Sequence, residues 1–306
     1  MSGAGERFRA RADAAAAAVL APSPLTRWRR RVFGHRGFAF GAAVLLLVLL
    51  MAILAPLLAP ADPYAQDLAQ RLIPPVWHAQ GSWVHPLGTD QLGRDYLARL
   101  LYGARISLLI GVSTMAISGL IGGSLGILAG YFGGRVDLAI SFLLTVRLSL
   151  PVILVALAVV AVIHGSLEVV ILVLGALLWD RFLVVMRSTT QQIRRLDYIA
   201  AAAAVGASTF RILVGEVLPN ALNNLIVVAT LEMAHAILLE AALSFLGLGV
   251  QPPLPSWGLM LSEGKPFMFF SPWLITIPGT MLFLLVLAIN LLGDGVRDLT
   301  APENRG

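Results

Sequence analysis

The sequence contains no cysteine, a single lysine (Lys265) and few charged residues of either sign. Without cysteine the chain has no disulfides, no thiol catalysis and no thiolate metal ligands. Charged residues make up 13% of the chain, hydrophobic residues make up 58%, and the mean hydropathy is +0.84. This composition excludes an ordinary soluble domain and is typical of a protein that crosses a membrane several times.

The formal net charge is +5 and is carried almost entirely by arginine. A basic chain could bind nucleic acid, but these arginines are distributed by membrane side rather than along one groove-filling element. We therefore expect a membrane, and no nucleic acid, among the partners of this chain.

Six apolar runs are long enough to cross a bilayer, for which about 20 helical residues are needed. They cover residues 38–58, 106–130, 138–163, 169–186, 220–248 and 273–292. The predicted fold class is all-α, a polytopic membrane protein with six transmembrane helices. The basic tail 1–37, the two arginines of the tail 294–306 and the short arginine-rich loops place both termini on the cytoplasmic side. A cleaved signal peptide is the alternative for the first run, but the run is too long for one, which favours a retained anchor.

Two of the runs carry local signals. In the second run, glycines at positions 119 and 123, and at 122, 126 and 130, recur at four-residue spacing. Small residues at this spacing let helix backbones approach closely, so we expect packing rather than ligand binding. The third run is interrupted by Arg147 and should bend near Pro151, because proline removes a helical hydrogen bond.

Residues 196–219, between the fourth and fifth runs, are organised differently. An alanine run favours a short helix that ends at Gly206, where glycine can adopt the left-handed conformation. Ser208 can cap a second short helix, and Pro219 can stand in the first turn of a new one. The second helix is expected to present an apolar edge made of Phe210, Leu213 and Val217. From these residues alone, a docking element and an ordinary surface helix are equally open interpretations.

The pattern Ala201-Ala202, three residues, Gly206, then Leu218-Pro219 resembles the EAA loop of type I ABC importer permeases. The chain departs from that pattern with Ala200 where the family usually has glutamate and Glu216 where it usually has an aliphatic residue. The resemblance implies that the loop contacts and couples to a partner ATPase. The coupling residues that it implies are Asp197, Tyr198, Ala201, Ala202, Gly206, Ser208, Arg211, Leu218 and Pro219.

Two further passages, 85–95 and 240–258, resemble the C-type permease subunit of the dipeptide, oligopeptide and nickel importer branch. The resemblance implies a bacterial plasma membrane protein that carries di- or oligopeptides, with nickel or another small solute as the alternative cargo. It implies three kinds of partner: a homologous B-type permease, two ABC ATPase subunits and an extracytoplasmic substrate-binding protein. The implied organisation is a tail (1–37), a first helix with an extracytoplasmic loop (38–103), a permease domain (104–293) and a tail (294–306).

No phosphate-binding loop is expected in this chain. Gly258 and the pair Gly264-Lys265 are one residue too far apart for one, and Pro266 replaces the hydroxyl residue that would bind magnesium. We therefore predict a transport subunit rather than an enzyme, with no cofactor of its own and with ATP and magnesium on the partner ATPases.

Charged and histidine residues inside apolar runs are costly and usually face water, a partner or a pathway. The candidates for a translocation path are Arg147, Glu232, His235 and Glu240, and Arg147 is preferred because its depth leaves little scope for snorkelling. The alternative is that each bonds to a neighbouring helix. His85, Asp90 and Asp95 have no spacing typical of a metal site.

Two other functions compete with an ABC permease. A proton-driven secondary transporter could use Glu232, His235 and Glu240, but it leaves the loop 196–219 unexplained. A membrane scaffold that transports nothing explains neither that loop nor the buried charges.

Overall fold

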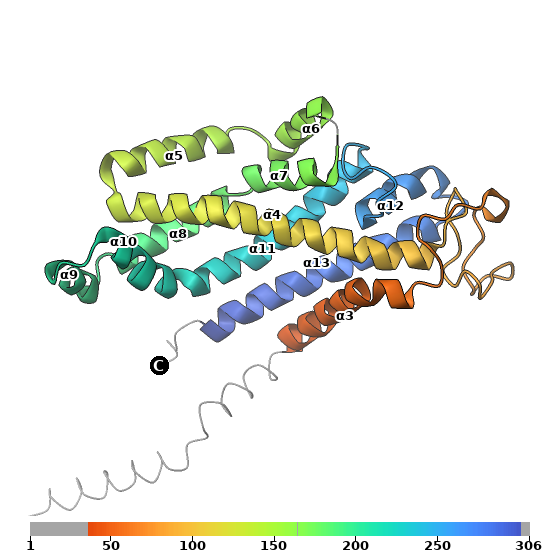
Figure 1. The fold of residues 1–306 in the computed structure, drawn as a ribbon, viewed down its shortest axis with the longest axis horizontal. Coiled ribbons are helices and arrows are strands. Elements are labelled where there is room, and N and C mark those ends of the chain that lie inside the picture. Colours follow the sequence, from red (N-terminus) through yellow and green to blue (C-terminus); the bar gives the residue numbers. More distant parts are fainter. Residues whose placement is uncertain (1–35, 164, 301–306) are drawn as a thin grey trace, which may run out of the picture.

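The computed structural model describes residues 36–163 and 165–300, and within these ranges the regular structure is helical. The helices form an elongated bundle whose long axis runs across Figure 1. The membrane-length elements are α3 (Arg36–Leu58), α4 (Tyr96–Phe132), the pair α5 (Gly134–Leu148) and α6 (Val152–Ile163), the pair α7 (Leu167–Leu177) and α8 (Asp180–Ile193), α11 (Leu218–Phe245) and α13 (Trp273–Thr300). In the described part of the chain, 5 helical segments are long and apolar enough to cross a membrane, and the bent pair α5–α6 makes up to 6.

The predicted bend in the third run is confirmed. Helices α5 and α6 meet at 79° across a break after Leu148, at the position of Pro151. The fourth run, predicted as one span over 169–186, is one span in the structure, Leu167–Ile193, but its helix is interrupted: α7 ends at Leu177 and α8 begins at Asp180. Apolar composition indicates that a segment crosses the bilayer, but it does not show where the helix is interrupted.

Helices α4 and α13 extend beyond the boundaries that were predicted for them. Helix α4 begins at Tyr96, inside the predicted loop 59–103, because the side chain of Asp95 accepts a hydrogen bond from the Ala98 N–H and caps the helix. Helix α13 continues to Thr300, so the predicted tail from 294 begins as helix. Both extensions contain charged residues, and an apolar run marks only the part of a helix that lies in hydrocarbon.

The glycines of α4 allow the close helix packing that their spacing predicts. A Cβ atom at Gly126 would lie 2.7 Å from the Leu183 carbonyl oxygen, and one at Gly130 would lie 2.6 Å from the Arg187 carbonyl oxygen. Both carbonyls belong to α8, so glycine allows α4 and α8 to pack backbone against backbone. These two helices form the centre of the bundle.

A short helix lies between the fifth and sixth apolar runs, after a proline-rich passage at 252–255. Helix α12 (Trp257–Gly264) begins at Ser256, whose side chain accepts from the Leu259 N–H. Trp257 is fully buried, and its Nε1–H donates to the Leu100 carbonyl of α4 at 2.9 Å. Serine directly before an apolar stretch was the available helix-start signal, and the neighbouring prolines masked it.

A buried charge cluster ties this end of the bundle together. Arg94 donates to Asp90 at 2.6 Å and to Glu263 of α12 at 3.0 Å, and Arg99 of α4 contacts the same two carboxylates. Asp90, Arg94 and Arg99 are almost completely buried. Two arginines and two carboxylates balance in charge, as ionised groups that are removed from water must. We call Asp90, Arg94, Arg99 and Glu263 the α12 charge cluster.

His85, Asp90 and Asp95 are residue types that bind metals, but each is engaged by other side chains of the protein. His85 bonds to Asp95 at 2.8 Å and to Gln70 at 2.8 Å, whereas Asp90 belongs to the α12 charge cluster. Each of the three thus has a protein partner.

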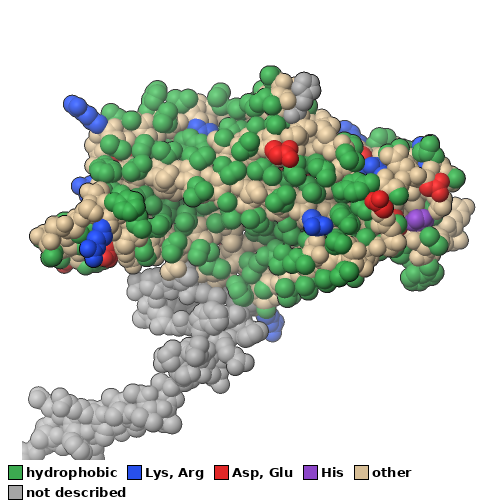
Figure 2. All heavy atoms as spheres, viewed as in Figure 1, with side chains coloured by type: hydrophobic (Ala, Val, Ile, Leu, Met, Phe, Trp, Pro, Cys, Tyr) green, Lys and Arg blue, Asp and Glu red, His purple; other side chains and the backbone are tan. Residues whose placement is uncertain are grey.

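Hydrophobic side chains cover much of the long flank shown in Figure 2, and charged side chains gather toward its two ends. This distribution is that of a bundle set in hydrocarbon with polar ends in the headgroup regions. Helices α9 (Asp197–Ala204) and α10 (Thr209–Ile212) lie at one end, and α12 with the loop 59–95 lies at the other (Figure 1).

Candidate functional site

Helices α9 and α10 form the helix, turn and helix that the sequence predicts. Val205 ends α9, and Gly206 follows with φ of +88°, in the left-handed region that glycine tolerates best. The N–H of Gly206 donates to the Ala203 carbonyl and that of Ala207 to the Ala202 carbonyl, which closes the helix end. No neighbouring atom lies within 4 Å of a Cβ placed at Gly206. Backbone conformation, not crowding, therefore demands glycine here.

Ser208 caps α10 as predicted, since its side chain accepts from the Arg211 N–H. Helix α11 begins at Leu218 with Pro219 in its first turn, as predicted. Helix α10 leads into α11 through a π-helical turn, Leu213–Val217, which the sequence did not indicate. The N–H of Leu218 donates to the Leu213 carbonyl, the wider spacing of a π turn. One continuous helical path thus joins the α9–α10 pair to a membrane-length helix.

The predicted apolar edge of α10 is not formed. Phe210 is 75% exposed, whereas Val217 is fully buried and Leu213 is half-buried. The π turn adds a residue per turn and shifts the side chains that follow it to a different face. The pair is held to the bundle by a separate apolar cluster, whose buried members are Met186, Ile193, Ile199, Ile212, Val217 and Ala221.

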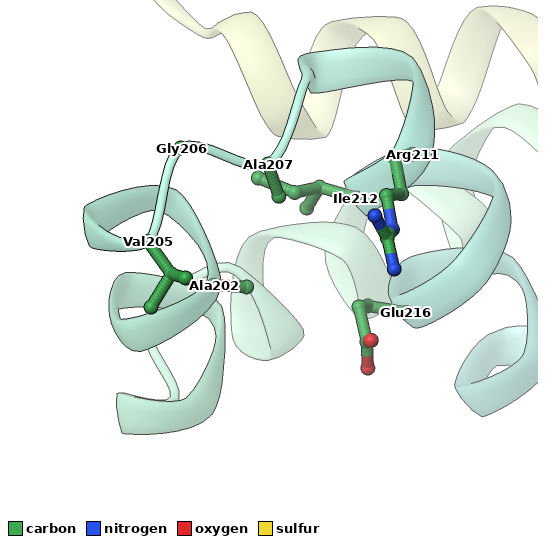
Figure 3. A pocket seen from close by; sticks show the side chains of 7 residues that line it. All are labelled: Ala202, Val205, Gly206, Ala207, Arg211, Ile212 and Glu216. Carbon is green, nitrogen blue, oxygen red and sulfur yellow. The ribbon is translucent and has the colours of Figure 1, made fainter.

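A pocket of about 260 Å³ opens between the two short helices (Figure 3). Ala202 and Val205 face it from α9, and Arg211, Ile212 and Glu216 face it from α10 and the π turn. Val205, at the rim, is 90% exposed. The result is a small, open concave surface lined by small and aliphatic side chains and by one residue of each charge.

The other predicted coupling residues lie around the same element. Asp197 occupies the first turn of α9, and Tyr198 is exposed beside it. Ala201 is exposed, Leu218 is half-buried at the start of α11, and Pro219 is exposed. The structure therefore brings the predicted coupling residues together at one end of the molecule.

Arg147, the preferred path candidate, stands at a helix break. Its Nε–H donates to the Leu177 carbonyl at 2.7 Å, and its guanidinium lies 3.5 Å from Asp180. Leu177 is the last residue of α7, where backbone carbonyls lack helical partners. Arg147 thus has a structural role, because it donates a hydrogen bond to a backbone carbonyl at the interruption between α7 and α8.

Glu240 is also hydrogen-bonded to neighbouring segments of the protein. It is fully buried and accepts hydrogen bonds from Ser244 at 2.7 Å and from Ser256, the cap of α12, at 2.9 Å. Glu240 lies eight residues from Glu232, about 12 Å along a helix. The three residues suggested for proton transfer therefore do not form one cluster.

Glu232 and His235 do lie together, with a partner that the sequence did not suggest. Arg181, at the start of α8, approaches the buried Glu232 carboxylate at 2.9 Å, and His235 lies 3.4 Å from the same carboxylate. The Arg181 approach is close but poorly aligned for a hydrogen bond. Arg181 lies within the fourth apolar run, and packing of α8 against α11 brings it beside Glu232.

A second contact continues this polar line between α8 and α11. The Asn224 amide donates to the Thr189 hydroxyl at 2.9 Å. Thr189 is eight residues after Arg181 and Asn224 is eight residues before Glu232, as expected for antiparallel helices in register. We call Arg181, Thr189, Asn224, Glu232 and His235 the α8–α11 polar seam.

Comparisons with known proteins agree with this architecture. Residues 122–306 match the family model described as the binding-protein-dependent transport system inner membrane component. Residues 23–75 match the N-terminal TM domain of oligopeptide transport permease C. The chain belongs to this permease family. It is a multi-pass inner membrane protein and a transport subunit rather than an enzyme.

Similar relatives extend over nearly the full permease. The chain is 40% identical over 292 residues, 95% of its length and 96% of the relative's, to the di/tripeptide transport system permease protein DppC of Pseudomonas aeruginosa. It is 39% identical over 269 residues, 88% of its length and 91% of the relative's, to the dipeptide transport system permease protein DppC of Haemophilus influenzae.

A solved structure supports the fold of the permease. The MetNI methionine ABC transporter in an inward facing form has a chain that matches with a TM-score of 0.54 and 20% identity, covering 66% of this permease and 96% of that chain. At this identity the likeness concerns the fold alone. A binding-protein-dependent ABC permease works with an ATPase and with other transport subunits.

Proposed function

We propose that this chain is the C-type permease subunit of an ATP-driven importer for di- and oligopeptides. The names of the relatives support this cargo, since the two described above are peptide permeases. A relative from Pectobacterium atrosepticum, 38% identical over 276 residues, is a glutathione permease, which is also a peptide-like cargo. The proposed cargo is therefore a short peptide rather than nickel.

The observation that carries the proposal is the α9–α10 pair. It stands at one end of the bundle, exposes Val205 and Phe210, opens a pocket, and continues through a π turn into α11. An ATPase that moved against this surface would displace a helix that crosses the membrane. The proposed coupling residues are those around the pocket, Asp197, Tyr198, Ala201, Ala202, Gly206, Ser208, Arg211, Leu218 and Pro219.

Alanine at position 200 is compatible with this role. Position 200 is exposed on α9, and Glu216, at the other departure from the family pattern, lines the pocket. A carboxylate is thus present at this surface, but it comes from the π turn rather than from α9.

The complete transporter in this proposal contains a homologous B-type permease, two ATPase subunits that bind ATP and magnesium, and an extracytoplasmic substrate-binding protein. The α9 end and both termini lie in the cytoplasm, and the α12 end faces outward. The path runs between the two permeases, past Glu232 and His235. Arg147 and Glu240 have partners that serve neighbouring segments, so the proposed path does not include them.

Uptake by the reconstituted complex tests this function. Proteoliposomes that contain the permease pair, the ATPases and the binding protein should accumulate a labelled dipeptide only when ATP is supplied. Collapse of a proton gradient with ATP maintained should leave uptake unchanged. Uptake that follows the proton gradient would establish a secondary transporter, and uptake of nickel without peptide would replace the proposed cargo.

A further inference from the structure

The charged part of the α8–α11 polar seam lies at the middle of a membrane-length helix. Glu232 is preceded by 14 residues of α11 and followed by 13, so it lies roughly 20 Å from either end of that helix. The hydrocarbon core is only about 30 Å thick. A charged group at this position is therefore beyond the reach of either headgroup region.

Within the seam, the two charged groups have opposite exposure. The Glu232 side chain is 1% exposed, whereas the Arg181 side chain is 58% exposed. The guanidinium thus has a buried carboxylate behind it and an open side in front. A guanidinium carries five N–H donors in a planar fork, and Glu232 approaches only Nη1.

The open side of Arg181 cannot face lipid, because hydrocarbon offers no partner to a charged group at this depth. The exposed surface of α8 and α11 is mixed: Val184 and Ile226 are exposed, and Ser188 and Asn223 expose polar side chains near the Thr189–Asn224 contact. A charged side chain with exposed hydroxyl and amide groups on the same helices indicates water or a polar cargo on that side.

We propose that Arg181 contacts the cargo in the translocation path, through its free N–H groups, and takes the carboxylate that every peptide carries at its C-terminus. Glu232 is the positioning residue that holds the guanidinium toward the path. This inference rests on the proposed function, since it assumes a peptide cargo. A single cation that binds the C-terminal carboxylate recognises a group common to all peptides, which suits a transporter whose cargo varies in its side chains.

The ion pair also explains how such a site releases its cargo. Glu232 competes with the cargo carboxylate for the same guanidinium, so binding at Arg181 is weak. A group on a transport path must bind well enough to admit the solute and weakly enough to let it leave. An unpaired arginine at the same depth would hold an anion too firmly.

The absence of cysteine from the chain gives a direct test of the aqueous path. Val184 lies one turn after Arg181 on the same exposed side of α8, and Ile53 is an exposed control on the wholly apolar stretch of α3. In the full complex, Val184→Cys should react with a charged, water-soluble methanethiosulfonate in at least one nucleotide state, and excess dipeptide should slow the reaction. Ile53→Cys should not react. A Val184→Cys variant that is inert in every nucleotide state overturns the proposal.

Substitution of Arg181 tests the contact itself. Arg181→Gln should lower dipeptide uptake by about tenfold or more at equal membrane abundance, as expected for the loss of a charge-assisted hydrogen bond. Arg181→Lys should be intermediate, because it keeps the charge and loses the fork. Arg135→Gln, at an exposed arginine of α5, is the matched control and should leave uptake unchanged. Normal uptake by Arg181→Gln overturns the proposal.

A double variant separates contact with the cargo from a merely structural role. If Arg181 only neutralises a buried carboxylate, Arg181→Gln with Glu232→Gln should restore uptake, and that result overturns the proposal. If Arg181 binds the cargo, uptake by the double variant stays as low as in Arg181→Gln. Wild-type complex that takes up no dipeptide would refute the proposed function itself, and with it the peptide cargo at Arg181. Wild-type uptake with no effect of Arg181→Gln would refute this inference alone.

Discussion

The two ends of the bundle are built in opposite ways. At the α12 end, ionised side chains are buried and paired with opposite charges, and Trp257 is fully enclosed. At the α9 end, large apolar side chains such as Phe210 and Val205 are exposed, and a pocket opens between short helices. Large apolar side chains are exposed at both ends, Phe269 and Phe270 at the α12 end among them, so the ends differ in the buried charges of one and the pocket of the other.

The difference follows from what holds each end. The α12 charge cluster joins the loop 59–95, α4 and α12 through directional contacts, so none of these elements can move without separating buried charges. The α9–α10 pair is held by one small apolar cluster and by a glycine turn. An element with few anchors can shift as a unit, which a coupling element requires.

The largest effect should come from breaking the α12 charge cluster. Arg99→Ala leaves the carboxylates of Asp90 and Glu263 short of a cation in a buried site, and should cost about 3–5 kcal/mol of unfolding free energy. Thermal unfolding of the purified complex in detergent measures it. Arg105→Ala, at an exposed arginine of the same helix, is the control and should be nearly neutral. Equal stability of both variants would show that the cluster does not hold this end.

A smaller effect is expected midway between the two ends, at the break between α7 and α8. Arg147→Ala removes the donor to the Leu177 carbonyl and should cost about 1.5–3 kcal/mol. Ser149→Ala, at an exposed hydroxyl that bonds only within its own turn, should change stability little. Loss of uptake with full thermal stability in Arg147→Ala would instead return this residue to the translocation path.

At the α9 end, a change in the turn should affect coupling more than stability. Gly206→Val places a β-branched residue at φ of +88°, a strain of about 1–2 kcal/mol. Because the turn sets the angle between α9 and α10, transport per ATP hydrolysed should fall severalfold while the permease remains in the membrane. Gly215→Ala is the control, since its Cβ would meet open space and its φ is not positive. Normal coupling in Gly206→Val would argue against the docking role.

The smallest effect on the stability of the permease should come from removing exposed phenylalanines. One such residue at each end allows the two ends to be compared directly. Phe210→Ala, at the α9 end, and Phe269→Ala, after α12, both remove a side chain that is at least 75% exposed. Each should change unfolding free energy by less than about 0.5 kcal/mol. Only Phe210→Ala should reduce the amount of ATPase that co-purifies with the permease. Equal retention of ATPase by both variants would contradict the assignment of the α9 end to that partner.

Several features could be predicted from the sequence because their causes are local. Apolar runs of about 20 residues define spans, Pro151 interrupts a helix by its missing N–H, and Gly206 and Ser208 shape a turn through their own backbone preferences. The glycine spacing of α4 indicated close packing, although not that α8 is the partner. The role of residues 196–219 in coupling came from resemblance to a family, since their chemistry alone left docking and an ordinary surface helix open.

Only the tertiary structure decided which buried charges belong together. Arg147, Glu232 and Glu240 were all path candidates as charges in apolar runs, yet Arg147 and Glu240 are held by neighbouring segments, while Arg181 joins Glu232. The π turn and the interruption after Leu177 change the helix face on which the following side chains lie. A regular helical period counted along the sequence does not predict either change. Sequence by itself determined which residues enter the membrane, because transfer into hydrocarbon depends on composition. Their partners depended on helix phase and packing, which are set by contacts between residues far apart in the chain.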